Sequence, residues 1–161
     1  MPDTETVRAV LHMFNYGLFV AAANGESGPR AATVSWVTQV SFEPRLVAVA
    51  LRKGTAICDA VQHSRRFALH LVGEHQPEFA QAFFRSHEAA GEKLGGYSFG
   101  LSDRGVPLFG AAPAWVECEV VEEANREGDH ALFLARIVDE EIVSPGAPVL
   151  ALRDTPWHYG G

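Results

Sequence analysis

Short β-type segments separated by turns run through most of this chain and limit the folds that it can adopt. Residues 17–42 read as two such segments around a turn rich in Gly, Asn and Pro, and residues 43–53 and 65–73 add others. Residues 114–143 alternate apolar and polar side chains on either side of the turn "NREGD", which predicts a long hairpin. Many short strands with few helices predict a mainly β fold, built as a small antiparallel barrel.

Three short helices are expected, of which the first is a lid or brace and the other two interrupt the sheet. The first lies near the N-terminus, where apolar residues recur at spacings of three and four, with Asp3 or Thr4 as its cap. Its apolar residues are Val7, Val10, Leu11 and Phe14. Residues 55–64 and 76–86 fit the other two helices. The expected fold is therefore a barrel with a few short flanking helices.

Two further stretches lack a clear periodic pattern. Residues 88–112 are rich in glycine and longer than a routine connection, and long loops of this kind often cover binding sites. The C-terminal residues "PWHYGG", 156–161, combine aromatic side chains with glycines. We expect this tail to dock on the body of the protein or on a second subunit.

Length, charge and cysteine usage narrow the class of protein. The 161 residues suffice for one domain with its own core, expected to span residues 1–161. The 13 basic and 20 acidic residues give a formal charge of −7, which argues against nucleic acid or anionic lipid as a partner. No apolar run is long enough to cross a bilayer and no signal-peptide pattern opens the chain, so a cytoplasmic location is expected. Cys58 and Cys118 stand alone and are expected to be buried, reduced thiols.

Residues 32–44, "ATVSWVTQVSFEP", place an unusual number of hydrogen-bonding groups in one predicted strand. Side chains alternate between the two faces of a strand, so one face of this strand would be mostly polar. That face carries Thr33, Ser35, Val37, Gln39 and Ser41, and the other carries Val34, Trp36, Thr38 and Val40. The polar face is either a solvated sheet surface or the wall of a ligand site, and Trp36 is expected in the core.

Residues 51–61, "LRKGTAICDAV", contain a second site-like feature. Arg52 and Lys53 lead through Gly54 to Thr55 at the expected start of a helix. The free N–H groups of a helix start, its dipole, a hydroxyl and two cations together form a phosphate cradle. An ordinary strand-to-helix turn with solvated charges is the alternative. Because this segment closely follows the polar strand, the two could hold a flat polar ring at one end and its phosphate at the other.

Few other residues point to chemistry. His130 follows the hairpin turn and is either a catalytic histidine or one that lies on the surface or has its hydrogen bonds satisfied by the fold. The remaining histidines show no metal-binding spacing, so no metal site is expected. The chain has neither a GxGxxG motif after a strand nor a GxSxG motif, and neither cysteine has a catalytic signature. A Rossmann domain and a hydrolase are therefore not expected.

Seven stretches together resemble the flavin reductase family of FMN-binding split barrels. They occur in the family's order and cover nearly the whole chain. They are "ATVSWVTQVSFEP", "LVAVALRKGTAICDAV", "RRFALHLV", "EKLGG", "AWVECEVVE", "GDHALFLARIV" and "PVL". The resemblance implies a six-stranded antiparallel Greek-key split β-barrel that forms a homodimer and binds FMN, or sometimes FAD, near the subunit interface. It also implies that NADH or NADPH reduces this flavin, which many members supply to a partner monooxygenase.

The resemblance also assigns roles to individual residues. The flavin ring would be flanked by Thr33, Ser35, Trp36, Val37 and Thr38, with Gln39 and Ser41 beside it. The flavin phosphate would meet Lys53, Gly54 and Thr55, next to the second cation of this turn, Arg52. His130 would lie close to the flavin and the nicotinamide and is the expected catalytic residue.

The expected function is that of an NAD(P)H:flavin oxidoreductase, in which the nicotinamide and flavin rings must stack closely for hydride transfer. One alternative is a non-catalytic flavin-binding electron carrier, similar to a flavoredoxin. A more distant alternative is a relative of pyridoxamine-phosphate oxidases with another ligand.

Overall fold

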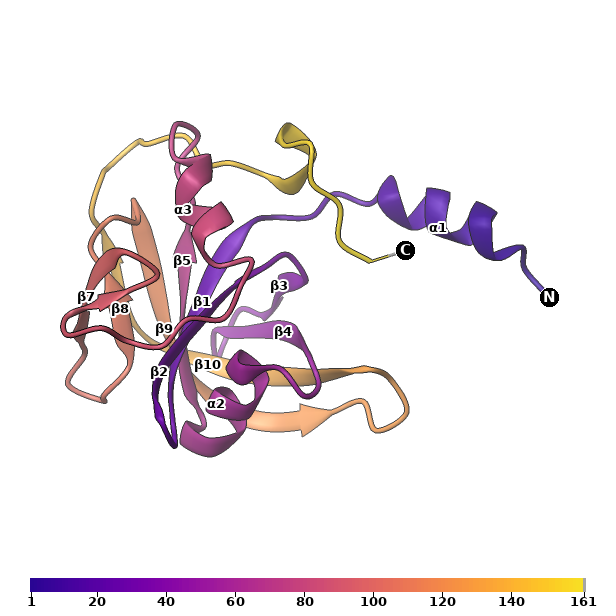
Figure 1. Cartoon of the computed structure of the whole chain (residues 1–161). Coiled ribbons are helices and arrows are strands. Elements are labelled where there is room, and N and C mark those ends of the chain that lie inside the picture. The colour runs from indigo at the N-terminus through magenta and orange to yellow at the C-terminus, as the bar shows by residue number, and fades with distance from the viewer. Residues whose placement is uncertain (161) are drawn as a thin grey trace.

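The structure is a computed structural model that describes residues 1–160, and it is mainly β (Figure 1). The helices are α1 (Thr4–His12), α2 (Ala56–Ser64) and α3 (Pro77–Ala82), with a short 3-10 turn, η1, at Leu152–Asp154. The strands of the main sheet are β1 (Phe19–Gly25), β2 (Gly28–Val34), β3 (Val37–Ser41), β4 (Leu46–Arg52), β5 (Arg66–Leu71), β9 (Ala114–Ala124) and β10 (His130–Ile142). A smaller sheet contains β6 (Lys93–Leu94), β7 (Tyr97–Leu101) and β8 (Pro107–Phe109).

The main sheet curls into a split barrel. Its order is β2-β1-β5-β9-β10-β4-β3, and every neighbouring pair is antiparallel. The two edge strands, β2 and β3, are consecutive in the chain and are joined only by Ser35 and Trp36. This short connection requires the two edges to approach each other, which bends the sheet. The expected mainly β fold with few short helices is confirmed, although the main sheet has seven strands in the described chain instead of six.

The additional strand arises because residues 32–44 do not form one continuous strand. Residues up to Val34 pair with β1, whereas Val37 begins the pairing with β4, and the backbone oxygen of Trp36 already accepts a hydrogen bond from Ala50. The chain therefore changes partners at Ser35 and Trp36. The expected single polar face is wrong, because a period-two pattern persists only while a strand keeps one neighbour.

The long hairpin β9–β10 is confirmed and positions the first residue of β10. In the pairing of β10 with β4, His130 lies opposite Arg52. The strand pair thus brings the end of the hairpin turn next to the turn that leads from β4 into α2. This register places two residues that are far apart in sequence at the same end of the barrel.

Helix α2 closes the inside of the barrel. Thr55 caps it by accepting a hydrogen bond from the backbone of Cys58, and Ile57, Cys58 and Val61 are buried in the barrel core. Both cysteines are free and buried, as expected. Burial raises the pKa of Cys58 to about 11 and that of Cys118 to about 12, so both thiols stay protonated at neutral pH.

A second core lies on the other face of β1. Val20 and Ala22 point into it, whereas the alternate residues Ala21 and Ala23 point into the barrel. α3 and the glycine-rich stretch 88–112 supply much of the rest, including Phe79 and the smaller sheet, and the C-terminal residues Leu150 and Leu152 add to it. The stretch 88–112 therefore covers a core, and none of its residues lines the cavity described below.

His70 connects three strands at this second core. Its side chain is fully buried, Nδ1 lies 2.9 Å from the backbone oxygen of Val20, and Nε2 accepts the backbone N–H of Phe109 at 3.0 Å. A neutral ring with its proton on Nδ1 satisfies both contacts. Burial lowers the pKa of His70 to about 4, so the ring is neutral at physiological pH.

The N-terminal helix stands away from the rest of the molecule (Figure 1). Asp3 caps α1 by accepting the backbone N–H of Thr6 at 2.9 Å, as expected from the sequence. No residue of α1 is buried, and Val7 and Val10 remain exposed. In the described chain, no helix is long and apolar enough to cross a membrane.

Candidate functional site: a cavity at the β2–β3 break

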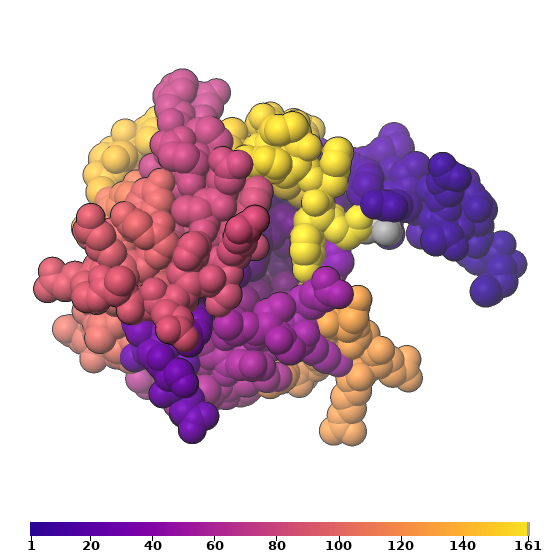
Figure 2. All heavy atoms as spheres, viewed as in Figure 1, coloured from indigo at the N-terminus to yellow at the C-terminus, as the bar shows by residue number. Residues whose placement is uncertain are grey.

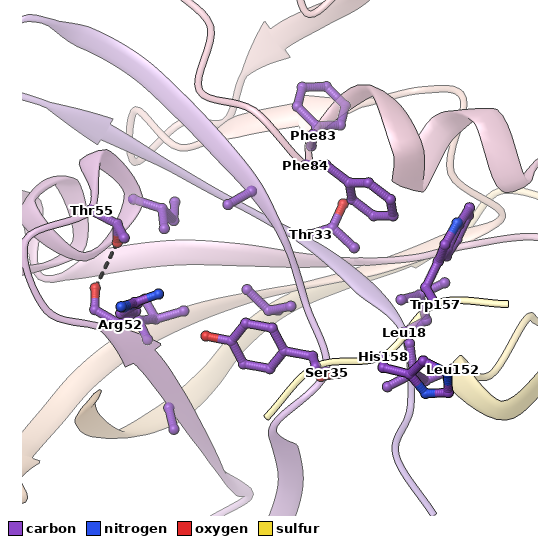
Figure 3. A pocket seen from close by; sticks show the side chains of 16 residues that line it. Leu18, Thr33, Ser35, Arg52, Thr55, Phe83, Phe84, Leu152, Trp157 and His158 are labelled. Carbon is purple, nitrogen blue, oxygen red and sulfur yellow. Dashed lines mark hydrogen bonds between the residues drawn. The ribbon is translucent and has the colours of Figure 1, made fainter. Parts of the chain in front are cut away.

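A cavity of about 440 Å³ opens where the barrel changes from β2 to β3. Its walls come from the ends of β2 and β4, the start of α2, the residues after α3 and the C-terminal tail. Figure 3 shows Arg52 and Thr55 at one end and Phe84, Trp157 and His158 at the other. The volume falls within the range of about 300–1,000 Å³ that is typical of cofactor and ligand sites.

Ser35 contributes an unpaired hydroxyl to this cavity. The residue is 5% exposed, and its Oγ atom has no hydrogen-bond partner within the described residues. The neighbouring Thr33 also lines the cavity, but its hydroxyl donates to the backbone oxygen of Ala80 at 2.5 Å. A buried hydroxyl without a partner is costly, so the Ser35 hydroxyl is available to a polar ligand in the cavity.

The turn from β4 into α2 supplies the polar end of the cavity. Gly54 has a φ of +79°, a conformation that side chains rarely adopt, and this bend brings Thr55 to the cap position of α2. The Thr55 hydroxyl donates to the backbone oxygen of Arg52 at 2.7 Å (Figure 3). Arg52 and Thr55 both line the cavity. A guanidinium beside the start of a helix is a suitable place for an anionic group.

Lys53, in contrast, is turned toward the β9–β10 hairpin. Its ammonium donates to the backbone oxygens of Asn125 at 2.8 Å, Arg126 at 3.2 Å and Gly128 at 2.6 Å. Its backbone N–H also donates to the oxygen of Asp129. Since an ammonium has three protons, these contacts use all of them. In this structure Lys53 supports the turn that precedes His130 and does not line the cavity.

His130 is held on both sides of its ring. Its Nδ1 lies 2.6 Å from Oδ1 of Asp129, and its Nε2 lies 2.6 Å from the hydroxyl of Tyr159. His130 is 7% exposed, and its ring packs at 4.5 Å, centroid to centroid, against Trp36. The hydrogen bond from His130 holds the pKa of Asp129 below its usual value, so the carboxylate fixes the ring proton on Nδ1.

Several residues that the sequence assigned to the flavin ring lie elsewhere in the structure. Val37 begins β3 and packs against the barrel core. Thr38 and Gln39 are exposed on β3, and Ser41 ends that strand. None of these four residues lines the cavity. Trp36 does not line it either, although it packs at 5.1 Å against Tyr159, which does. The reason is again the change of strand partner after Val34.

The sequence reading missed the aromatic wall of the cavity. Phe83 and Phe84 follow α3 directly, and Trp157 packs edge-on against Phe84 at 4.8 Å. Tyr159 is the tail residue nearest to His130. The aromatic tail "PWHYGG" was the only sequence signal for this wall. Its residues Trp157, His158 and Tyr159 dock on the body of this chain, which is one of the two expected outcomes. Gly161 lies outside the described residues.

These features fit a flat, polar, anionic cofactor. One end of the cavity offers a cation and a helix start, the middle offers an unpaired hydroxyl, and the other end is aromatic. In the described chain, no three His, Cys, Asp or Glu side chains gather in a way that could hold a metal ion. A split barrel with such a cavity matches the class of protein that the sequence resemblance predicts, the flavin-binding split barrels.

Comparisons with known proteins agree with this class. The family model of the flavin reductase like domain matches residues 11–156. An NADH:FMN oxidoreductase of Rhodococcus qingshengii is 30% identical over 149 residues, which are 89% of this chain and 75% of the relative. The NADH-dependent flavin reductase StyB of Pseudomonas fluorescens is 32% identical over 136 residues, 84% of this chain and 76% of the relative.

Solved structures give the same result. The styrene monooxygenase flavin reductase of Pseudomonas putida S12 has a TM-score of 0.77 and 30% identity, with 96% of each chain covered. A putative flavin reductase of Haemophilus somnus has a TM-score of 0.84 at 18% identity, covers 98% of this chain and 99% of its own, and shows the shared fold. The chain belongs to the flavin reductase like domain family, as its sequence resemblance predicted.

Proposed function

We propose that this protein is an NADH:flavin oxidoreductase that binds FMN in the cavity between Ser35 and Arg52. The observation that carries this proposal is that one cavity joins an unpaired buried hydroxyl to a guanidinium at a helix start. FMN has a polar ring and a phosphate that match these two features. FAD shares both groups and is the second choice.

The residues of the chain divide the work of binding. Arg52 and the Thr55 end of α2 hold the phosphate, and the hydroxyl of Ser35 addresses the polar edge of the ring. Hydrogen-bond donors at that edge stabilise the negative charge that grows on reduction. Phe84 and Trp157 cover the opposite end and exclude water.

A bound flavin supplies the electron acceptor for hydride transfer from the nicotinamide. His130 takes no part in the hydride transfer itself, because it neither donates nor accepts the hydride. Its role is to orient the nicotinamide. Asp129 keeps the proton of His130 on Nδ1, so Nε2 is left as a hydrogen-bond acceptor. We assign this acceptor to the carboxamide N–H of the nicotinamide, which would fix the orientation of the donor ring.

The relatives support proposals for the electron donor and for the acceptor of the reduced flavin. Relatives named as NADH-dependent in Rhodococcus and Pseudomonas favour NADH over NADPH. A reductase component of a 4-nitrophenol monooxygenase of Rhodococcus opacus matches 98% of this chain at 26% identity. We therefore propose that this protein supplies reduced flavin to a monooxygenase component. A cytoplasmic location would give it access to NADH.

We also propose that the protein works as a homodimer. Val7 and Val10 on α1 and Phe42 after β3 remain exposed. Large exposed apolar side chains of this kind indicate a protein surface that is covered in the assembly. A two-fold dimer is the commonest closed assembly and would cover them.

Anaerobic mixing of the FMN-loaded protein with NADH, and separately with NADPH, tests the function. The proposal predicts loss of the visible flavin absorption with NADH at a rate that saturates with its concentration. If FMN binds tightly but neither nucleotide reduces it, the protein is a flavin carrier. If FMN and riboflavin both fail to bind, the proposed cofactor is wrong.

A further inference from the structure

The C-terminal segment, residues 156–160, lies across the mouth of the cavity. Figure 2 shows this segment, in yellow, crossing in front of the hollow above the purple region that carries α2. Three successive side chains, Trp157, His158 and Tyr159, line the cavity. His158 also stacks on His12 at 5.1 Å, with an interplanar angle of 17°. The tail is therefore an element of the site itself.

Tyr159 uses the only ring nitrogen of His130 that is open to a ligand. Nδ1 is engaged by Asp129 at 2.6 Å, and Nε2 is engaged by the Tyr159 hydroxyl at 2.6 Å. Burial raises the pKa of Tyr159, so its hydroxyl keeps its proton and donates to Nε2. One lone pair accepts one such donor. Any ligand that needs Nε2 must first displace Tyr159.

The aromatic ring of Tyr159 also fills space beside His130. It packs edge-on against Trp36 at 5.1 Å, and it lines the cavity whereas His130 does not. Tyr159 thus stands between His130 and the cavity. Removing its ring would open a path from the cavity to Nε2.

The attachment of this segment is weak enough to be reversed. After Thr155, no backbone N–H of the described tail bonds to another backbone oxygen. The tail is held by side-chain packing, by the contact to His130 and by the oxygen of Gly160, which lies 2.8 Å from Nε2 of His12. Tyr159 itself is 41% exposed. Segments with few buried contacts and no backbone pairing open at small free-energy cost.

Gly160 permits the tail to approach this closely. Its φ is +82°, and a Cβ at this position would lie 2.5 Å from a ring carbon of Trp36. Any larger residue would clash with Trp36 and displace the end of the tail. Gly160 therefore offers a way to move Tyr159 off His130 without changing Tyr159.

We infer that Tyr159 is an internal competitor of the nicotinamide, occupying its place on His130 and thereby setting the affinity for the dinucleotide. This inference rests on the proposed function, because it takes Nε2 of His130 as the carboxamide acceptor. Binding of the dinucleotide then includes displacement of residues 156–160, and the free energy of that displacement is subtracted from the affinity. The tail therefore also determines specificity. A ligand recovers the free energy of displacing Tyr159 only if it donates its own hydrogen bond to Nε2 of His130.

The test measures NAD⁺ binding to the FMN-loaded full-length protein by titration calorimetry. NAD⁺ carries the same carboxamide and cannot reduce the flavin, so binding is observed without turnover. The variants are Tyr159→Phe, which removes the donor to Nε2, and Gly160→Val, which keeps Tyr159 but displaces the tail. Tyr97→Phe is the matched control, because Tyr97 packs against Phe79 in the second core and lies outside the cavity.

The inference predicts that Tyr159→Phe lowers the Kd for NAD⁺ by about three- to tenfold, the range for one net hydrogen bond. Gly160→Val is expected to lower it at least as much, and Tyr97→Phe to leave it unchanged. Wild-type affinity in both tail variants would overturn the inference. Weaker binding in both would also overturn it, since Tyr159 would then hold the dinucleotide. If no variant and no wild-type protein bound NAD⁺, NADH or NADPH, the proposed function itself would fall.

Discussion

The ammonium of Lys53 lies 2.6 Å from the backbone oxygen of Gly128, so the turn before α2 supports the turn that precedes His130. One side chain thereby couples the proposed phosphate-binding turn to the segment that carries His130. Arg52, the neighbour of Lys53, faces the cavity instead. The two adjacent cations therefore have different tasks, and substitutions can separate them.

Arg52→Gln should weaken the binding of FMN but not that of riboflavin, because riboflavin lacks the phosphate. We expect the Kd for FMN to rise about five- to tenfold, as for a charge-assisted contact that is partly exposed. Lys53→Met should instead change the affinities for FMN and riboflavin equally, because Lys53 supports the β9–β10 turn and does not contact the phosphate. Fluorescence titration of both flavins measures the difference. If Lys53→Met lost affinity for FMN but not for riboflavin, Lys53 would contact the phosphate, as the sequence predicted.

Ser35→Ala tests the unpaired hydroxyl in the cavity. The variant should bind both FMN and riboflavin about three- to tenfold more weakly, because it removes one hydrogen bond to the ring. Without ligand it should be at least as stable as the wild type, since the lost hydroxyl has no partner in the described chain. Thr38→Ala is the control, because it removes an exposed hydroxyl from β3. Equal flavin affinities in all three proteins would remove Ser35 from the site.

His70 predicts how stability depends on pH. Its pKa is about 4 in the folded protein and near 6.5 in the unfolded chain, so the unfolded chain binds the additional proton between these values. The free energy of unfolding should be unaffected by His70 above pH 6.5 and should be lower by about 3 kcal/mol at pH 4. Urea unfolding across this range measures the loss.

His70→Gln should flatten this part of the pH profile, because an amide can make both hydrogen bonds but does not titrate there. His75→Gln, which replaces an exposed ring, should keep the wild-type profile. If His70→Gln folds poorly, an NMR titration of the wild type is the second measurement. A His70 ring that titrates near pH 6.5 in the folded protein would show that this interpretation is wrong.

The sequence predicted those elements whose pattern is local. The cap and length of α2 and the β9–β10 hairpin depend on residues that are neighbours in the chain, and both were found. The break at Ser35 and Trp36 was missed because apolar and polar side chains continue to alternate across it, while the strand partner changes. The alternation of apolar and polar side chains does not indicate which strand a segment pairs with.

The candidate site was predictable only in part for the same reason. Ser35, Arg52 and Thr55 lie in or beside segments with recognisable patterns, and all three line the cavity. The contact of Tyr159 with His130 joins residues 29 positions apart, and nothing in either local sequence points to the other. Backbone oxygens of the β9–β10 turn hold the ammonium of Lys53 away from the cavity. Every residue has a backbone oxygen, so the sequence gives no signal for such a contact.

The exposed face of α1 predicts the oligomeric state. The wild type should be a dimer at micromolar concentration in light scattering, and Val10→Glu should shift it toward monomer by placing a charge in an apolar contact. Glu5→Gln, on the same helix, should leave the dimer intact. A wild-type monomer with flavin fully bound would contradict the proposed assembly.

The rate of flavin reduction in His130→Ala tests the central claim most directly, namely that this cavity is a flavin reductase site with His130 at the nicotinamide. Anaerobic stopped-flow measurements at saturating NADH should give a limiting rate about 10- to 100-fold below that of the wild type, with FMN affinity nearly unchanged. This corresponds to about 1.4–2.7 kcal/mol of transition-state stabilisation. A limiting rate equal to that of the wild type in folded, FMN-loaded His130→Ala would contradict the account.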